Sequence, residues 1–488
     1  MALFTVLVLS TVRDASSLFS YPVAVGGDGY YYVLQINQLL KNGHLYFASY
    51  TPLAFYILAG LSFLTRNPIL AIKLGSVGFN ALLCLGVFAL VSSTTRNQWL
   101  GVLGCAIAAL SGMHFYMIAE FIKNLAGVAL LIWAAWCASG ALENYQARVA
   151  TSSVLIILAL LSHISIWGIA PGLFVLVLIL RCLTNEKRSK LLKLTLTFAV
   201  LFLMICPALI AFQRFVQLPP WLGSELLIRP RWPISLRSPA GKAEMLALLL
   251  TAPTTLFLIV RHRPASSGNR FRLIVGAVAM WSVVVTLNPF LNHDMKQLGI
   301  IGRLDHLMYL QVAMIFPALI GLSLHFHRKL AWLLLALTPC FLAASLLASL
   351  PKGLQSWYLI ERQQMIQALP EHRQQLGTNP LVIAQHGDEF VVTWVLGIPA
   401  QQNVTRHTNN QSVYWLLHQV NPALLTPSME VVMEENSGFG LVLVKRDELR
   451  EWLDHLDKEE KDRVLAQNPH LENYVSESQT ISKSGLES

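Results

Sequence analysis

The chain has 488 residues, of which 54% are hydrophobic and 13% are charged, and its formal net charge is +9. Soluble domains are about 25% charged, so this composition argues against a soluble fold for most of the chain. Several apolar runs reach about 20 residues, the length at which a helix crosses a bilayer. They are continuous rather than alternating, which disfavours a transmembrane β-barrel. We therefore predict a polytopic α-helical membrane protein.

The basic charge does not indicate a nucleic-acid partner, and the cysteines do not indicate zinc ligands or disulfides. Most Lys and Arg residues lie in short loops between apolar runs, as the positive-inside rule requires. The charge therefore indicates membrane topology, and we predict no nucleic-acid partner. The six cysteines lie in or beside apolar runs without a CxxC pair, which indicates small core residues rather than zinc ligands or disulfides.

The first ten residues are apolar but too short to span a membrane, and Arg13 and Asp14 follow them. A cleaved signal peptide is one interpretation, but the segment has no basic n-region and no Ala-x-Ala site. We favour a first transmembrane helix that is short, tilted, or truncated by the choice of start codon.

An extramembrane loop, residues 14–67, contains a glycine-rich stretch around Asp28. The Asp28 carboxylate can cap a helix that starts near Tyr30, and Gly43 suits the left-handed conformation that ends it. The apolar face of this helix would carry Tyr32, Val33, Ile36, Leu39 and Leu40, and the polar face Gln35, Asn37, Gln38 and Lys41. This pattern predicts a helix in the membrane interface. Residues 51–64 predict a second interfacial or half-inserted helix.

Further apolar segments bring the predicted transmembrane helices to about eleven. They lie at about 68–92, 98–114, 124–140, 151–162, 165–182, 192–211, 243–260, 272–287, 307–324 and 330–350. The basic loops at 181–193, 261–272 and 328–329 are cytoplasmic under the positive-inside rule, which makes the N-terminus cytoplasmic. The Asp28 loop, the Glu120 turn, the loops 212–242 and 288–306 and the C-terminus are then extracytoplasmic. The basic residues within 212–242 either weaken this topology or point to an anionic ligand.

The composition changes at about residue 351, and the remainder predicts a small extracytoplasmic α/β domain, residues 351–475. Two short apolar runs, 381–384 and 441–444, predict buried strands. Three segments predict helices: 388–395, 413–419 and 446–456. The polar residues 476–488 predict a disordered tail.

Several polar residues in the outer loops are candidates for chemistry. Glu120 and Lys123 are three residues apart and would share a helix face, either as functional groups or as an interfacial ion pair. His163 interrupts an apolar stretch, and it either lines the outer mouth or is a hydrogen-bonded bundle residue. Arg303 offers a planar guanidinium that suits phosphate oxygens, or it is an interfacial anchor.

The loop 288–306 also carries residue types that ligate metals: His293, Asp294, Asp305 and His306. Their spacing matches no compact metal-binding motif. The sequence therefore assigns no metal ligand and leaves the cofactor unknown.

Three motifs resemble the GT-C membrane glycosyltransferases, which include protein O-mannosyltransferases, bacterial aminoarabinose transferases and oligosaccharyltransferases. The first is Gly27-Asp28-Gly29-Tyr30-Tyr31-Tyr32 with residues 35–43 after it, the second is Thr51-Pro52-Leu53-Ala54-Phe55-Tyr56, and the third is Ala119-Glu120-Phe121-Ile122-Lys123-Asn124. The resemblance covers about residues 1–325. Many members have two adjacent carboxylates in the first loop, whereas here Gly29 takes the second position, which argues against a metal held by two carboxylates.

This resemblance implies inverting transfer of a hexosyl or pentosyl sugar from a polyprenyl-phosphate donor to a lipid, glycan or protein acceptor. The reaction would take place on the extracytoplasmic face of a bacterial inner membrane. The implied catalytic residues are Asp28, as general base, and Glu120; the implied substrate-binding residues are Lys123, Arg303, His163 and Tyr31. Two alternatives stay open: a transporter or flippase for a lipid-linked sugar, and a non-catalytic assembly subunit.

Overall fold

The computed structural model describes residues 1–46, 52–163, 166–184, 239–261, 270–287, 307–346, 350–402, 411–427, 429–434 and 439–471. The chain divides into two compact units, which are described one at a time. The helical unit comprises Met1–Ser17, Ala48–Gly60 and Leu74–Pro351. The sheet unit comprises Leu18–Phe47, Leu61–Lys73 and Lys352–Ser488.

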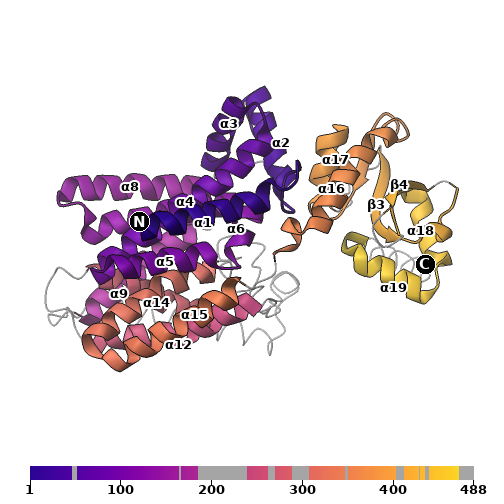
Figure 1. The fold of residues 1–488 in the computed structure, drawn as a ribbon. Coiled ribbons are helices and arrows are strands. Elements are labelled where there is room, and N and C mark those ends of the chain that lie inside the picture. Colours follow the sequence, from indigo (N-terminus) through magenta and orange to yellow (C-terminus); the bar gives the residue numbers. More distant parts are fainter. Residues whose placement is uncertain are drawn as a thin grey trace, which may run out of the picture. The chain divides into compact units, whose positions relative to one another are not determined.

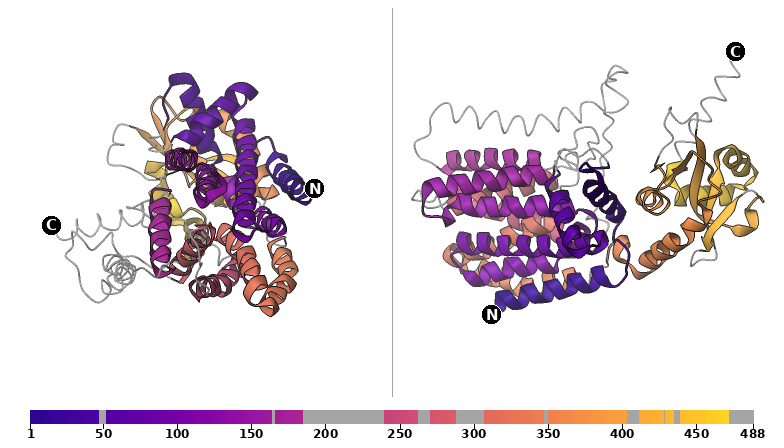
Figure 2. Two further views of the ribbon diagram at one scale, coloured as in Figure 1. Left: turned by 90° about the vertical axis from the view of Figure 1, so that its left-hand side faces the viewer. Right: turned by 90° about the horizontal axis from the view of Figure 1, so that it is seen from above.

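The helical unit is built from apolar helices that lie side by side (Figure 1). They are α1 (Ala2–Phe19), α4 (Pro68–Thr95), α5 (Gln98–Leu110), α6 (His114–Glu120), α7 (Ile122–Trp136), the π-helical η1 (Cys137–Ala141), α8 (Tyr145–Ser162), α9 (Ile166–Thr184), α12 (Pro239–Arg261), α13 (Arg270–Leu287), α14 (Met308–Phe326) and α15 (Arg328–Leu346). Seen from above, the helices of this unit again run side by side (Figure 2). Helix α14 packs against α5, α12 and α15, and α7 packs against α8. Bulky apolar side chains and close backbone approaches, such as Gly104 against the Ala313 carbonyl, hold such bundles together.

Six helices in the described residues are long and apolar enough to cross a membrane. The chain is therefore a multi-pass membrane protein, as its composition predicted. The expected count of about eleven spans is not confirmed: the segment 192–211 lies outside the described residues, and α5, with 13 residues, is short for a span. Helix α1 continues through Arg13 and Asp14 instead of ending before them.

The sheet unit has a mixed five-stranded sheet in the order β2-β1-β3-β5-β4. Its strands are β1 (Pro380–Ile383), β2 (Ala400–Gln401), β3 (Ser412–Val420), β4 (Glu430–Glu434) and β5 (Gly440–Lys445). Strand β1 is parallel to β2 and β3, whereas β5 is antiparallel to β3 and β4. A core of Trp415, Leu417, Val442 and Trp452 lies between this sheet and its helices.

The helices of the C-terminal residues are α16 (Ser356–Ala368), α17 (Asp388–Leu396), α18 (Arg446–His455) and α19 (Lys458–Gln467), with single 3-10 turns η4 (Lys352–Leu354), η5 (Leu369–His372), η6 (Pro422–Leu424) and η7 (Pro469–Leu471). The predicted strands at 381–384 and 441–444 and the predicted helices at 388–395 and 446–456 are confirmed. The helix predicted at 413–419 is wrong, because these residues form β3. The whole of the predicted tail, residues 476–488, lies outside the described residues.

Helices α2 (Gly29–Asn42) and α3 (Leu53–Thr65) confirm the two helices expected in the first loop. Gly43 is left-handed at φ 72°, and its N–H donates to the Leu39 carbonyl, so the predicted end of α2 is also confirmed. The predicted faces are partly wrong: Gln35 is fully buried and Leu40 is exposed. The reason is that α2 packs against α17 within the sheet unit, which buries more than the apolar face.

Candidate active site

Asp28 does not cap α2. It occupies the N-cap position with φ −81° and ψ −1°, and its carboxylate makes no capping hydrogen bond with the described residues of the helix. Capping residues usually have an extended backbone that aims the side chain at the free N–H groups, and Asp28 lacks that conformation. Its Oδ1 instead lies 3.1 Å from His386 Nε2, with 20% of the side chain exposed.

The chain just before α2 folds tightly around Asp28. Gly26 has a φ of 79°, and its N–H donates to the Gly353 carbonyl at 3.1 Å. Gly29 lies so close to Ala24 that an added Cβ would stand 3.1 Å from the Ala24 carbonyl carbon. The backbone packing therefore explains why a glycine, rather than a second carboxylate, follows Asp28.

The partner of this loop is the turn that joins β1 to α17. Gly387 has a φ of 100°, and a Cβ there would stand 3.0 Å from the Gly27 carbonyl oxygen. Arg362 Nη1 donates to the Gly387 carbonyl at 3.0 Å, and the Gly387 N–H donates to Glu389 Oε2 at 2.5 Å. The turn is thus fixed from both sides, and it sets the position of His386 against Asp28.

His386 bridges two carboxylates. Its Nε2 faces Asp28, and its Nδ1 lies 3.3 Å from Glu389 Oε1, which also accepts a hydrogen bond from Gln402 Nε2 at 2.7 Å. The hydrogen bonds to Asp28 and Glu389 outweigh burial and raise the pKa of His386 to about 10. The imidazole is therefore a cation at neutral pH. It holds Asp28 in one orientation, while the second carboxylate of the cluster comes from α17.

Tyr31 lies beside this cluster. Its ring centroid is 5.4 Å from that of Phe390, and the His386 ring stands at 5.9 Å from Phe390, edge to face. Such contacts fix ring orientation. The structure therefore brings one predicted substrate-binding residue into the surroundings of Asp28.

Glu120 and Lys123 lie in the helical unit, but not on one helix face as predicted. The backbone of Phe121, at φ −124° and ψ 46°, ends α6 and starts α7, so the two side chains belong to different helices. Lys123 Nζ lies 5.2 Å from the centre of the Phe55 ring. Its ammonium group therefore makes a cation–π contact with the α3 segment.

Two other predicted residues have different outcomes. His163 ends α8 and is half-buried, with its N–H donating to the Ala159 carbonyl at 3.3 Å. Arg303 lies outside the described residues, as do the four potential metal ligands of the loop 288–306. Among the described residues, no group of three His, Cys, Asp or Glu side chains is arranged to hold a metal ion. The cofactor thus stays unassigned.

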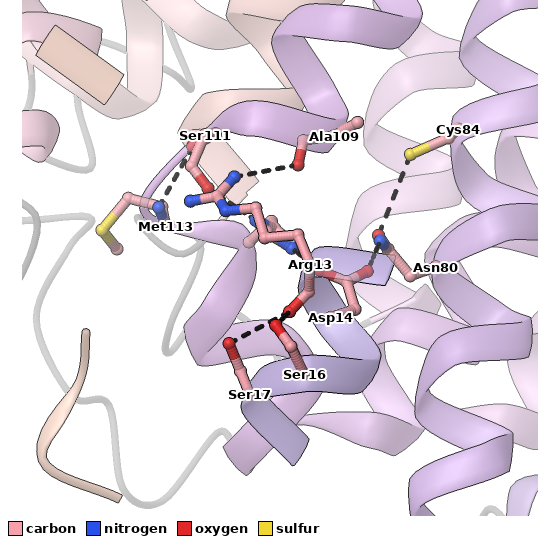
Figure 3. A network of polar contacts seen from close by, with 10 residues as sticks. Arg13, Asp14, Ser16, Ser17, Asn80, Cys84, Ala109, Ser111 and Met113 are labelled. Carbon is pink, nitrogen blue, oxygen red and sulfur yellow. Dashed lines mark hydrogen bonds and ion pairs between the residues drawn. The ribbon is translucent and has the colours of Figure 1, made fainter. Parts of the chain in front are cut away.

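The helical unit contains a second polar cluster, which the sequence did not reveal (Figure 3). Asp14 Oδ1 lies 2.7 Å from His114 Nε2, and Asn80 Nδ2 donates to Asp14 Oδ2 at 2.6 Å. His114 Nδ1 contacts the Ser111 carbonyl at 2.6 Å, and the Ser111 hydroxyl donates to Glu244. All five side chains are buried. The cluster links α1, α4 and α12 through the segment between α5 and α6.

His386 and Glu389 were not predicted from the sequence. One signal points to them: the run His386-Gly387-Asp388-Glu389 comes directly after a short apolar strand and opens a helix. Ligand-binding residues of α/β sheets gather at the carboxyl ends of parallel strands, and β1 is parallel to both of its neighbours. Their pairing with Asp28 is a tertiary contact that no local pattern records.

Neither a protein-family model nor a curated protein sequence matches the chain. Solved structures do match. The archaeal oligosaccharyltransferase AglB of Archaeoglobus fulgidus, in complex with an inhibitory peptide and a dolichol-phosphate, is 12% identical with a TM-score of 0.51, over 82% of this chain and 64% of that chain. An Archaeoglobus fulgidus oligosaccharyltransferase with zinc and sulfate is 14% identical with a TM-score of 0.49, over 81% and 62%.

The chain therefore spans slightly less than two thirds of the length of these two proteins. At this identity the likeness shows the fold. The chain shares its fold with the archaeal oligosaccharyltransferase AglB, and oligosaccharyltransferases are among the proteins that the three motifs resemble.

Proposed function

We propose that the chain is a membrane glycosyltransferase that moves a sugar from a polyprenyl-phosphate-linked donor to an acceptor, with Asp28 as general base. The observation that carries this proposal is the pairing of Asp28 with His386 at 3.1 Å, in place of a helix cap. A carboxylate that is positioned by a neighbouring side chain and still partly exposed can accept a proton from an acceptor within hydrogen-bond reach. The AglB structure, which contains a dolichol-phosphate and a peptide, supports a lipid-linked donor and an acceptor of that kind.

The proposed reaction is a single displacement. The acceptor nucleophile forms a bond to the anomeric carbon, the bond from that carbon to the phosphate oxygen breaks, and the acceptor proton passes to Asp28. This step inverts the anomeric centre and releases polyprenyl phosphate. His386 and Glu389 keep Asp28 in place, as supporting residues do in preorganised sites.

We propose that the remaining predicted residues bind or orient the donor and the acceptor. Lys123 and Arg303 would stabilise the charge that develops on the phosphate as it leaves, and Glu120 would orient Lys123 or the acceptor. His163 and Tyr31 would contact the substrates. We further propose that the reaction takes place on the extracytoplasmic face of a bacterial inner membrane, with the N-terminus in the cytoplasm.

The test is transfer by Asp28→Asn in membranes supplied with polyprenyl-phosphate sugars. Asp447→Asn, which changes an exposed carboxylate on α18, is the matched control. We expect the transfer rate of Asp28→Asn to be about 100-fold or more below that of the wild type. The transfer rate of Asp447→Asn should equal that of the wild type. Undiminished transfer by a normally expressed Asp28→Asn protein would refute the general base.

A transporter or flippase for a lipid-linked sugar is the second candidate. The buried cluster of Asp14, His114 and Glu244 favours it, because ionisable residues inside a membrane bundle often mark a transport path. Single cysteines placed beside this cluster distinguish the two functions. Labelling that alternates between the two membrane sides with substrate supports transport, whereas unchanged labelling supports the transferase.

A further inference from the structure

A cavity of about 140 Å³ opens in the sheet unit, and neither His386 nor Glu389 is among the residues that line it. It is lined by side chains of α16, of the β1–α17 turn and of β3, among them Trp357, Tyr358, Gln385, Asp388 and His418. A water molecule occupies about 30 Å³ in the liquid, so the cavity holds a few waters or one small ring. The proposed transfer chemistry uses none of these five side chains.

A buried ionic group forms one wall of the cavity. Asp388 Oδ1 lies 3.3 Å from Arg362 Nη1, and Asp388 Oδ2 lies 2.8 Å from His418 Nε2. Burial alone would raise the pKa of Asp388, but Arg362 and His418 outweigh it and hold the pKa well below its usual range. Arg362 also donates to Tyr358 Oη. These mutual contacts fix the side chains of the wall in position before any ligand binds.

Apart from His418, the charged side chains of the lining are two of each sign. Lys352 and Arg362 are basic, and Glu361 and Asp388 are acidic. The other polar lining groups are His418 and the amides of Gln385, Gln419 and Gln467. Amides both donate and accept hydrogen bonds, which suits hydroxyl groups. A phosphate would need an excess of cations, so the lining favours a neutral, hydroxyl-rich ligand.

Aromatic rings complete the cavity. Trp357 is 44% exposed, its Nε1 donates to Gln355 Oε1 at 2.6 Å, and Lys352 Nζ lies 5.5 Å from the rings of Trp357 and Tyr358. An aromatic face carries partial negative charge. The C–H bonds on one face of a pyranose present the matching apolar, slightly positive surface, while its hydroxyl groups point outward toward polar partners.

We propose that this cavity binds a neutral sugar ring, namely a non-reacting ring of a glycan substrate. That the ring belongs to a substrate rests on the proposed function, whereas the binding itself does not. The competing account makes Trp357 and Tyr358 aromatic anchors of the membrane interface, and it predicts no sugar binding.

The test uses the full chain in lipid nanodiscs made without maltoside detergents, because a sugar headgroup would compete for the cavity. The probes are methyl glycosides of glucose, mannose, galactose and N-acetylglucosamine, followed by saturation-transfer NMR and titration. We expect at least one to bind with a millimolar Kd, and Trp357→Ala to weaken it at least tenfold. Ile360→Ala, an exposed position on the same helix outside the lining, should leave the Kd unchanged.

Two further variants keep the test decisive. If Trp357→Ala lowers the Tm, Gln467→Ala removes one amide from an exposed lining position and should still weaken binding, while Trp357→Phe should retain part of it. Binding of none of the glycosides by the wild type, equal binding by Trp357→Ala, or displacement by equimolar inorganic phosphate would each overturn the proposal.

The experiment distinguishes a failure of the sugar-binding proposal from a failure of the proposed transferase function. Asp28→Asn should bind the glycoside as the wild type does, even though its transfer rate falls. If Asp28→Asn keeps full transfer while the glycoside binds at Trp357, the general base is wrong and the sugar subsite stands. If Asp28→Asn loses transfer and no glycoside binds, the sugar subsite is wrong and the general base stands.

Discussion

Asp28 Oδ1 lies 3.1 Å from His386 Nε2, so a loop near the N-terminus and a turn of the C-terminal residues share one ion pair. The pair makes the docking of α2 on α17 depend on pH. The folded-state pKa of His386, about 10, lies above the unfolded value of about 6.5. Its contribution to stability is therefore complete below about pH 6.5 and is lost as the pH rises through about 10.

His386→Gln tests this dependence. We expect the variant to melt a few degrees below the wild type at pH 6 and the two Tm values to converge by about pH 10.5. The difference is small because the imidazole is 55% exposed and solvent weakens such pairs. Thermal unfolding at several pH values measures it, with Asp447→Asn as the control. A Tm difference that stays constant or grows with pH would show that His386 is not the titrating group.

Gly387→Ala should release the Asp28 loop from its partner turn. The positive φ alone costs about 1–2 kcal/mol for a residue with a Cβ, and here the Cβ would also stand 3.0 Å from the Gly27 carbonyl oxygen. Gly377→Ala is the matched control, because its φ is 76° and its Cβ would meet no described atom within 4 Å. Thermal unfolding should show a clearly larger loss for Gly387→Ala. Equal losses would mean that the contact with Gly27 is unimportant.

Replacing Gly29 by Asp supplies the second carboxylate of the GT-C motif, but we expect it to lower the transfer rate. Its Cβ would stand 3.1 Å from the Ala24 carbonyl carbon and from the Ala24 Cβ, which moves the backbone next to Asp28. Gly29→Ala adds the same Cβ without charge and should lower the rate by a similar factor. A rate increase in Gly29→Asp alone would show that the site lacks a carboxylate.

The buried contact between Asp14 and His114 should stabilise the helical unit. Both side chains are buried, at 1% and 0% exposure, and removal of one partner from a buried hydrogen bond costs about 1–3 kcal/mol or more. Asp14→Ala and His114→Ala should therefore each lower the Tm strongly, and the double variant should lose much less than the sum. Thermal unfolding in one detergent gives this double-mutant cycle. Strictly additive losses would exclude direct coupling.

The helices were predictable because lipid imposes long apolar runs. The predicted segments at 68–92, 243–260 and 307–324 correspond to α4, α12 and α14. Strand β3 was mistaken for a helix because a central strand buried on both faces does not alternate in polarity. Its pairing with β1 and β5, rather than local propensity, decides its structure.

Of the candidate site, Asp28 was predictable from the sequence, whereas its partners His386 and Glu389 were not. Asp28 stood out because glycines flank it and an aromatic helix follows it. His386 and Glu389 did not, since their approach to Asp28 depends on Gly387 packing against Gly27. The contact between Asp14 and His114 was not predictable either, because in the sequence each residue is an isolated polar group near a helix end.

The most direct test of the account is the single-turnover release of polyprenyl phosphate by the purified protein, with the wild type and Asp28→Asn compared at equal protein and donor concentrations. We expect a rate at least about 100-fold lower for Asp28→Asn, with a Tm lowered by no more than the few degrees expected for His386→Gln. Release at the wild-type rate by the folded variant would contradict the assignment of Asp28 as the general base.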